Sequence, residues 1–192
     1  MHAREARGLL SSVTSRWWIA GGWALDLFAG RETRAHEDLD IGILRCDVQR
    51  VVDSMLGWEF FEAKHGRLHA LERGAPGLDV HSLWGRPHGR KAWVLELMLE
   101  ESEGDSWVFR RERSIMRPLD SVTARTVEGI PYLVPEIQLL YKANRLRPKD
   151  DADFCFVAAR LDPGARAWLR DALARLDARH EWLGALQSPG GH

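Results

Sequence analysis

At 192 residues, the chain is long enough to bury one substantial hydrophobic core with a smaller helical lobe beside it. Its 27 Lys and Arg residues stand against 28 Asp and Glu residues, for a formal net charge of -1. This balance disfavours a nucleic-acid-binding protein or a polybasic membrane binder, so any phosphate must be bound by local groups.

The cysteines and the N-terminal residues give no sign of an exported protein. Cys46 and Cys155 lie far apart without a nearby cysteine, which is typical of reduced thiols rather than of a disulfide framework. The stretch from Met1 to Arg7 carries charges of both signs and leads only into a short apolar run, so we expect no signal peptide. No apolar stretch has the length of a membrane span. We therefore expect a cytoplasmic protein without a membrane partner.

The N-terminal part predicts a strand that runs through a Gly-Gly pair into a helix. Residues 4–15 have the spacing of an amphipathic helix, and the apolar run 17–20 predicts a buried strand that stops at two glycines. The apolar spacing at 23–29 then predicts a second helix, closed by Gly30, a residue type favoured after helix C-termini.

A mixed sheet is predicted by the residues that follow. After a polar loop, residues 39–44 alternate as a strand, and residues 47–56 have a helical pattern that ends at Gly57. Gly- or Pro-containing turns separate most of the next apolar runs. Further short strands are predicted at 58–63, 68–72, 78–83, 93–99 and 107–110.

The last third of the chain changes character at Pro135. Helical patterns follow at about 136–146, 150–160 and 164–178. We therefore expect an α+β protein with a mixed sheet, flanking helices and a C-terminal helical lobe. Its predicted parts are a catalytic domain at 1–134, the helical lobe at 135–187 and a flexible tail at 188–192.

Three acidic residues form the candidate metal site. Asp38 and Asp40 flank Leu39 at the start of a predicted strand, so their carboxylates point to the same side. Two such carboxylates repel each other unless a divalent cation lies between them, and hard oxygen ligands suit Mg2+ or Mn2+. Asp79, in the predicted strand 78–83, is the expected third ligand. An acidic pair alone is more often a solvated strand end, and the order of the motifs is what favours a site.

Gly21 and Gly22 are the candidate phosphate-binding residues. A Gly-Gly turn before a helix offers free backbone N–H groups at the positive end of the helix dipole, and both favour a phosphate. Such turns are common, so this signal depends on the order in which the motifs occur: strand, Gly-Gly, helix, Asp-x-Asp strand, later Asp strand.

The same motifs resemble those of a known family. The stretches Ile19–Asp26 and Gly30–Ile41, with Gly-Gly-Trp-Ala-Leu-Asp and Thr-Arg-x-His-x-Asp-Leu-Asp-Ile, are similar to the aminoglycoside and lincosamide nucleotidyltransferases of the DNA polymerase beta superfamily. Within that family the chain resembles the aminoglycoside-2''-adenylyltransferases. Residues from Gly129 to Asp150 resemble the C-terminal part of that family, so the likeness extends from about residue 9 to 180.

The resemblance implies a polymerase-beta-like nucleotidyltransferase fold and a metal-dependent reaction. By that likeness, Asp38 and Asp40 match the metal-binding pair, and Asp79 matches a third carboxylate that can also take the acceptor hydroxyl proton. Gly21 and Gly22 match the phosphate turn. It also implies Mg2+ or Mn2+, with ATP or another NTP as co-substrate and AMP passed to a hydroxyl of a small-molecule acceptor such as an aminoglycoside or lincosamide antibiotic.

The sequence also suggests roles for two cations and for several other side chains. We place Arg34 and Lys142 near the triphosphate, although a lysine on a helix face is more often solvated. Asp26 is expected to pair with Arg31 or Arg34. Whether the acceptor pocket is lined by acids or aromatic residues stays open; the candidates are Glu96, Glu100, Glu101, Trp84 and Trp107.

Two other functions are compatible with the sequence. The enzyme would modify an RNA or a protein instead of a small molecule, or the chain would be a non-catalytic NTP-binding module. The lack of concentrated basic sequence argues against RNA, and the presence of all three acids argues against an inactive module. The sequence leaves open whether the chain is a monomer or a homodimer.

Overall fold

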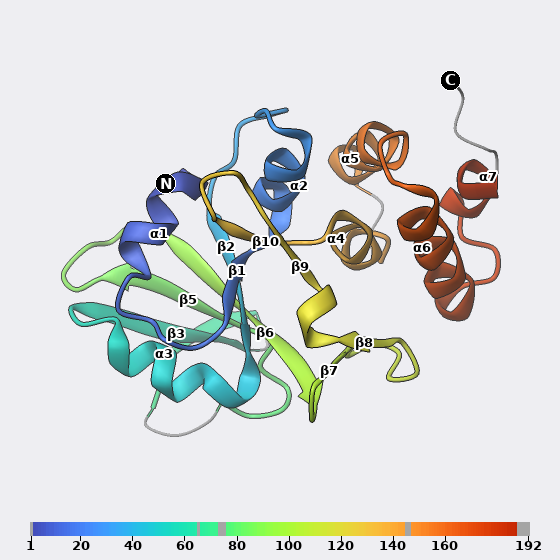
Figure 1. Cartoon of the computed structure of the whole chain (residues 1–192). Coiled ribbons are helices and arrows are strands. Elements are labelled where there is room, and N and C mark those ends of the chain that lie inside the picture. Colours follow the sequence, from blue (N-terminus) through green and yellow to red (C-terminus); the bar gives the residue numbers. More distant parts are fainter. Residues whose placement is uncertain (1, 65, 73–75, 145–146, 188–192) are drawn as a thin grey trace.

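A mixed sheet forms the centre of the fold, with helices on it and a group of helices at one end (Figure 1). The computed structural model describes residues 2–64, 66–72, 76–144 and 147–187. Within these residues the sheet has ten strands, in the order β4-β3-β5-β6-β2-β1-β10-β9, and β7 pairs with β6 and β8. The strands are β1 (Trp17–Ile19), β2 (Leu39–Leu44), β3 (Trp58–Lys64), β4 (Arg67–Ala70), β5 (Ser82–Pro87), β6 (Leu95–Glu103), β7 (Ser106–Val108), β8 (Met116–Pro118), β9 (Thr123–Arg125) and β10 (Pro131–Leu133).

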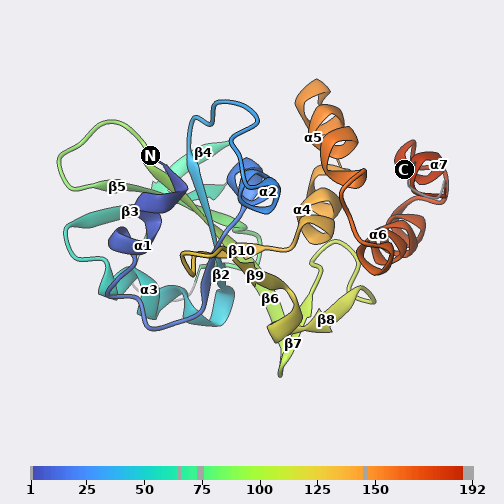
Figure 2. The same ribbon diagram turned by 45° about the horizontal axis from the view of Figure 1, so that its top comes forward.

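The helices divide between the sheet and the C-terminal lobe. Figure 2 shows α4 between the sheet and the group formed by α5, α6 and α7. Short 3-10 turns occupy Ala3–Glu5, Arg45–Asp47 and Leu119–Ser121. The α-helices are α1 (Ala6–Leu9), α2 (Gly21–Ala29), α3 (Val48–Ser54), α4 (Pro135–Lys142), α5 (Pro148–Ala158), α6 (Pro163–Leu176) and α7 (Trp182–Gln187).

The central strands β2 and β6 have one apolar and one polar face. Successive residues of a strand point to opposite faces, so every second residue shares an environment. On one face the side chains are buried in the core, at no more than 3% exposure: Leu39, Ile41, Ile43, Leu95, Leu97 and Leu99. On the other face lie Asp40, Gly42, Glu96, Met98 and Glu100. The alternation that predicts a strand at 39–44 therefore also determines which face is polar.

The structure confirms most predicted elements, with some corrections. The strand at 39–44 has the predicted bounds, whereas the helix predicted at 4–15 is reduced to a 3-10 turn and the one-turn helix α1, followed by turn residues. The second helix begins at Gly21, because the Gly-Gly pair forms its first turn. The strands β8, β9 and β10 and the helix α7 were not expected.

The strand predicted at 78–83 is displaced to Ser82–Pro87. Residues before it form a turn, closed by a hydrogen bond from the Val80 N–H to the Gly77 carbonyl (2.9 Å). Leu78 is 81% exposed, so it does not contribute the buried position that a strand here requires. An alternating pattern occurs in turns as well, and the ladder itself begins only at Ser82, opposite Met98.

The predicted domain boundary at 134/135 falls between β10 and α4. The division into two domains stays a prediction, and the tail predicted at 188–192 lies outside the described residues. Within the described part of the chain, no helix combines the length and the apolar character needed to cross a membrane.

Candidate functional site

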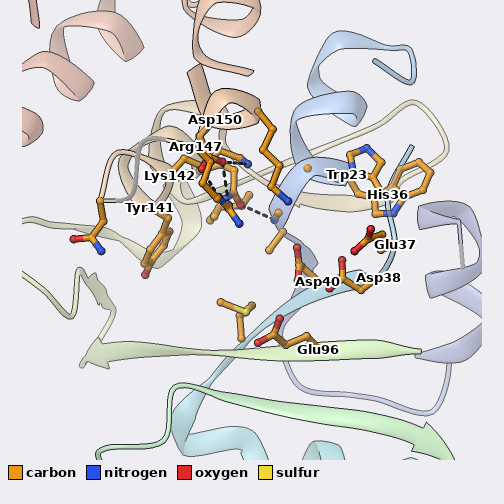
Figure 3. Close-up of a pocket in the computed structure, with 18 of the residues that line it drawn as sticks. Trp23, His36, Glu37, Asp38, Asp40, Glu96, Tyr141, Lys142, Arg147 and Asp150 are labelled. Atoms are coloured by element: carbon orange, nitrogen blue, oxygen red, sulfur yellow. Dashed lines mark hydrogen bonds and ion pairs between the residues drawn. The ribbon is translucent and has the colours of Figure 1, made fainter. Parts of the chain in front are cut away.

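Three carboxylates converge on the polar face of the sheet, and we call Asp38, Asp40 and Glu96 the carboxylate trio. Asp38 lies just before β2, Asp40 lies within it, and Glu96 is opposite Asp40 on the parallel strand β6. Oxygen atoms of the three side chains all lie within 4.8 Å of one another. Figure 3 shows them gathered below a group of basic residues. The group has the geometry and the ligand type of a site for a hard divalent cation.

The electrostatics of the trio favour binding of a cation. Burial, together with the nearby charges of Glu96 and Asp38, raises the pKa of Asp40 to about 7, and this value already includes the smaller opposite effect of Lys142 and Lys149. Burial also raises the pKa of Glu96, while a hydrogen bond with Ser82 lowers it. Like charges this close stabilise protonation of one another, and a cation relieves the same repulsion.

The structure does not bring Asp79 to the trio. Asp79 lies on the turn before β5 and forms an ion pair with Lys64 (2.8 Å). Lys64 lies four residues after Phe60 on β3, so both side chains are on the face of the sheet opposite to the trio, where Phe60 is buried. The prediction that Asp79 joins Asp38 and Asp40 is therefore wrong in position. Glu96 supplies the third carboxylate.

The Gly-Gly pair lies directly against the trio. Gly21 has φ +63° and opens α2, and its N–H donates to the side-chain oxygen of Gln138 (2.7 Å). A Cβ at Gly21 would overlap the Asp40 carboxylate, and one at Gly22 would overlap the His36 ring. Glycine is therefore required at both positions, because a Cβ would collide with the neighbouring side chain. At Gly21 the positive φ is a second reason. The positive end of the α2 dipole lies beside the trio, as a phosphate site would need.

The loop that precedes β2 is held by the buried carboxylate of Asp26. Asp26 accepts hydrogen bonds from the N–H (3.1 Å) and hydroxyl (2.5 Å) of Thr33. His36 accepts at Nδ1 from Arg34 (3.0 Å), so its Nε2 carries the proton and donates to Asp26 (2.5 Å). The expected side-chain pairing of Asp26 with Arg31 or Arg34 is wrong, because the Arg31 guanidinium lies over the Phe156 ring instead.

A second charged cluster joins the helical lobe to the cleft, and we call Arg34, Lys142, Arg147, Asp150 and Asp153 the lobe network. Lys142, almost fully buried on α4, forms ion pairs with Asp150 (3.0 Å) and Asp153 (2.9 Å) on α5. Arg147 also pairs with Asp150 (2.6 Å), and Arg34 pairs with Asp153 (3.4 Å). Burial acts to raise the pKa of Asp150, but hydrogen bonds from Arg147 and Lys142 outweigh it and leave that pKa lowered.

One cleft of about 740 Å³ is lined by the carboxylate trio and by every residue of the lobe network except Asp153. It brings together six of the seven residues predicted as site residues, and Asp79 is the exception. The predicted residues that line it are Gly21, Gly22, Arg34, Asp38, Asp40 and Lys142. Sequence reasoning did not assign a role to Gln138, Arg147 or Lys149, which also line the cleft, and considered Glu96 only for the acceptor.

The structure places the candidate residues for an acceptor pocket in different environments. Glu100 lines the cleft but is buried, and its Oε2 accepts from the Trp107 indole (2.8 Å) and the Tyr141 hydroxyl (2.5 Å). Trp107 is fully buried and cannot stack on a ligand. Glu101 pairs with Arg45 (2.7 Å), and Trp84 lines a separate, smaller pocket.

Comparisons with known proteins identify related sequences. A sequence model of the family described as aminoglycoside-2''-adenylyltransferase matches residues 4–152. A 2''-aminoglycoside nucleotidyltransferase of Escherichia coli is 37% identical over 70 residues, which cover 35% of this chain and 38% of that relative. The alignment thus spans well under half of the relative's length. A lincosamide resistance protein of Staphylococcus haemolyticus is 23% identical over 139 residues, covering 71% of this chain and 79% of the relative.

A solved structure shows the same fold. The solution structure of the antibiotic-resistance factor ANT(2'')-Ia superimposes with a TM-score of 0.57 at 16% identity, covering 95% of this chain and 92% of that one. The predicted α+β fold, a mixed sheet with flanking helices, is confirmed, and ANT(2'')-Ia shares it.

Proposed function

Since the chain belongs to the aminoglycoside-2''-adenylyltransferase family, we propose that it transfers a nucleoside monophosphate from an NTP to a hydroxyl group of a small molecule. We further propose that ATP is the donor, that AMP is transferred, and that Mg2+ or Mn2+ is required. The acceptor class is an antibiotic-like molecule of the aminoglycoside or lincosamide type.

The observation that supports this proposal most directly is the carboxylate trio beside the N-terminus of α2. Asp38, Asp40 and Glu96 offer only carboxylate oxygens, which are the ligands that Mg2+ and Mn2+ prefer. These residues therefore fit the metal that the family implies. When bound there, the cation would neutralise charge on the triphosphate and orient it for in-line attack.

The basic residues of the cleft suit the triphosphate. Lys149 and Arg147 line it and are exposed, and the positive charge of Lys149 opposes part of the rise in the pKa of Asp40. Arg34 and Lys142, predicted for this role, line the same cleft but are held by acids of the lobe network. We propose that Lys149 contacts the phosphates directly, and that Lys142 and Arg147, which both pair with Asp150, fix the position of α5 beside it.

Glu96 takes the role that the sequence assigned to Asp79. Its carboxylate lies beside Asp40 on the neighbouring strand, where it can accept the proton of a hydroxyl group that reaches the trio. In the proposed reaction the acceptor oxygen forms a bond to the α-phosphorus, the bond to pyrophosphate breaks, and the hydroxyl proton passes to Glu96. Asp38 and Asp40 would hold the metal.

The proposal is tested by incubating the full chain with Mg2+, each NTP in turn and a panel of hydroxylated antibiotics. We expect pyrophosphate release that depends on the acceptor, together with a product heavier than the acceptor by one nucleoside monophosphate. The matched control is Asp40→Asn, which preserves shape and removes the charge. An Asp40→Asn protein with native activity, or pyrophosphate release without any modified acceptor, would contradict the proposal.

A further inference from the structure

A row of paired residues connects the carboxylate trio to a second pocket on the same face of the sheet. In the ladder, Asp40 is opposite Glu96, Glu96 is opposite Trp84, and Trp84 is opposite Phe61. Paired residues on neighbouring strands project to the same face and lie about 5 Å apart. Trp84 is therefore the immediate neighbour of Glu96 on the side away from Asp40 and α2.

Aromatic rings form the floor and wall of this second pocket. Trp84 contacts Trp93 edge-on (ring centroids 6.2 Å apart), and Phe61 contacts the same Trp93 ring (5.1 Å). All three side chains are partly exposed. The pocket has a volume of about 360 Å³, large enough for one or two six-membered rings. Its lining residues are Ala63, Gly66, Arg67, Leu68, Trp84 and Trp93.

The charges around this pocket do not suit a polycation. Among the described residues, no carboxylate lines it, and one cation, Arg67, does. The guanidinium of Arg86 lies over the rings of Phe61 (4.9 Å) and Trp93 (4.5 Å). The nearby acid Glu59 is held by Arg86 in an ion pair (2.8 Å).

The main cleft offers few additional carboxylates to an acceptor with several ammonium groups. Glu100 is engaged by Trp107 and Tyr141, and Asp150 belongs to the lobe network. Arg110, in the same cleft, forms no ion pair or hydrogen bond with any residue that the structure describes. Outside the carboxylate trio, Glu37 is the one cleft acid in the described residues without such a partner.

We propose that the Trp84–Trp93 pocket binds the acceptor, and that the acceptor is a hydroxylated molecule with an apolar ring or chain and at most one positive charge. The inference rests on the proposed function and narrows its acceptor class. A sugar ring placed over Trp84 presents its hydroxyl groups to Glu96 on the neighbouring strand. The rest of the molecule then packs between Trp84, Trp93 and Leu68, where an aminoglycoside would desolvate ammonium groups against arginines.

The test is calorimetric binding of lincomycin and of tobramycin to the full chain, in the presence of Mg2+ and a non-hydrolysable ATP analogue. Lincomycin has one amine and an apolar substituent on its sugar, whereas tobramycin is polycationic. We expect lincomycin to bind about tenfold more tightly than tobramycin. Trp84→Ala and Trp93→Ala are each expected to weaken lincomycin binding about tenfold, with Trp84→Phe restoring most of it. Trp17→Ala, a partly exposed tryptophan on β1, is the control and leaves binding unchanged.

Each contrary outcome has a distinct meaning. Tighter binding of tobramycin overturns the acceptor class, and unchanged lincomycin binding in both Trp84→Ala and Trp93→Ala overturns the pocket. Absence of lincomycin binding to the native chain overturns the inference as a whole. Binding of the ATP analogue, measured in the same titration, together with pyrophosphate release on other acceptors, shows whether nucleotidyl transfer survives that result.

Discussion

Two charged clusters line the same cleft, but they differ in how their charges are neutralised. The carboxylate trio places three acids within 4.8 Å, and among the described residues Asp38 and Asp40 have no ion-pair partner. In the lobe network, by contrast, each buried acid meets two cations: Asp150 pairs with Lys142 and Arg147. Burial and the charges of Glu96 and Asp38 together raise the pKa of Asp40 to about 7, whereas the paired Asp150 has a lowered pKa.

This difference distinguishes residues that bind a ligand from residues that stabilise the fold. A buried charge that lacks a partner destabilises the fold and is retained where a ligand supplies the missing charge. A buried charge whose partner is present connects two elements, as Lys142 connects α4 to α5. Mutations in the first cluster should therefore change activity, and mutations in the second should change stability.

The largest expected effect is on activity and separates Glu96 from Asp79. Glu96→Gln should lower kcat by about a thousandfold, because a ligand worth several kcal/mol of charge stabilisation is lost. Asp79→Asn, the matched control, should change kcat by less than about threefold, since that residue pairs with Lys64 on the other face. Pyrophosphate release under saturating NTP measures both. The reverse ranking would return the third-acid role to Asp79.

The next effect is on the free energy of unfolding and concerns Lys142. Lys142→Met removes a buried cation that two buried acids share, so we expect a loss of about 3 kcal/mol. Lys149→Met, an exposed lysine at the same cleft, should change stability by less than about 0.5 kcal/mol. Urea unfolding followed by circular dichroism distinguishes the two. Equal losses would mean that the lobe network does not hold α4 and α5 together.

A somewhat smaller effect is expected from the metal itself. Mg2+ at about a hundred times its Kd should stabilise the native chain by about 2.7 kcal/mol, because the unfolded chain lacks the site. Asp40→Asn should abolish this gain. Without Mg2+, the variant should be at least as stable as the native protein, since a buried repulsive charge has been removed. Thermal unfolding with and without Mg2+ tests both statements, and equal Mg2+ stabilisation of the variant would contradict the metal site.

The smallest expected effect is a difference in pH dependence. Burial raises the pKa of Glu100 above 4.5, so the native state holds a proton that the unfolded state releases, and stability falls as pH rises from about 4.5. Asp150 has the opposite sign: its pKa is lowered, so its contribution is lost as pH falls below about 3.8.

The variants Glu100→Gln and Asp150→Asn each remove one of these contributions to the pH dependence of stability. Urea unfolding across acidic to neutral pH should show a weaker decline toward neutral pH in Glu100→Gln, with an effect of about 1 kcal/mol. Asp150→Asn should show a weaker loss of stability below about pH 3.8. An unchanged pH profile in both variants would contradict the opposite directions of the pKa shifts of Glu100 and Asp150.

Local patterns predicted the parts of the site that are close in sequence. The alternation of Leu39, Ile41 and Ile43 against Asp40 gives β2 its bounds and its polar face. Gly30 ends α2 with φ +68°, in the left-handed region that favours glycine. These features depend on periodicity and on the conformational preference of single residues.

The third acid could not be identified in this way. Glu96 reaches Asp40 because β6 pairs in parallel with β2 in one particular register, and that register depends on packing between strands far apart in the chain. A slip of one residue would place Leu95 or Leu97 at the site. The alternation of Leu95, Glu96 and Leu97 on a predicted strand was the available signal, but the same pattern at Leu78, Asp79 and Val80 belongs to a turn.

The contact between Gly21 and Asp40 has a mechanical consequence. The backbone of the first residue of α2 touches the acid directly, without a side chain between them that could change rotamer. The helix and the strand therefore cannot shift relative to each other without moving the carboxylate. Because the same helix end would orient the phosphates, this junction would fix the spacing between phosphate and metal, and a single methyl group at position 21 would disturb both together.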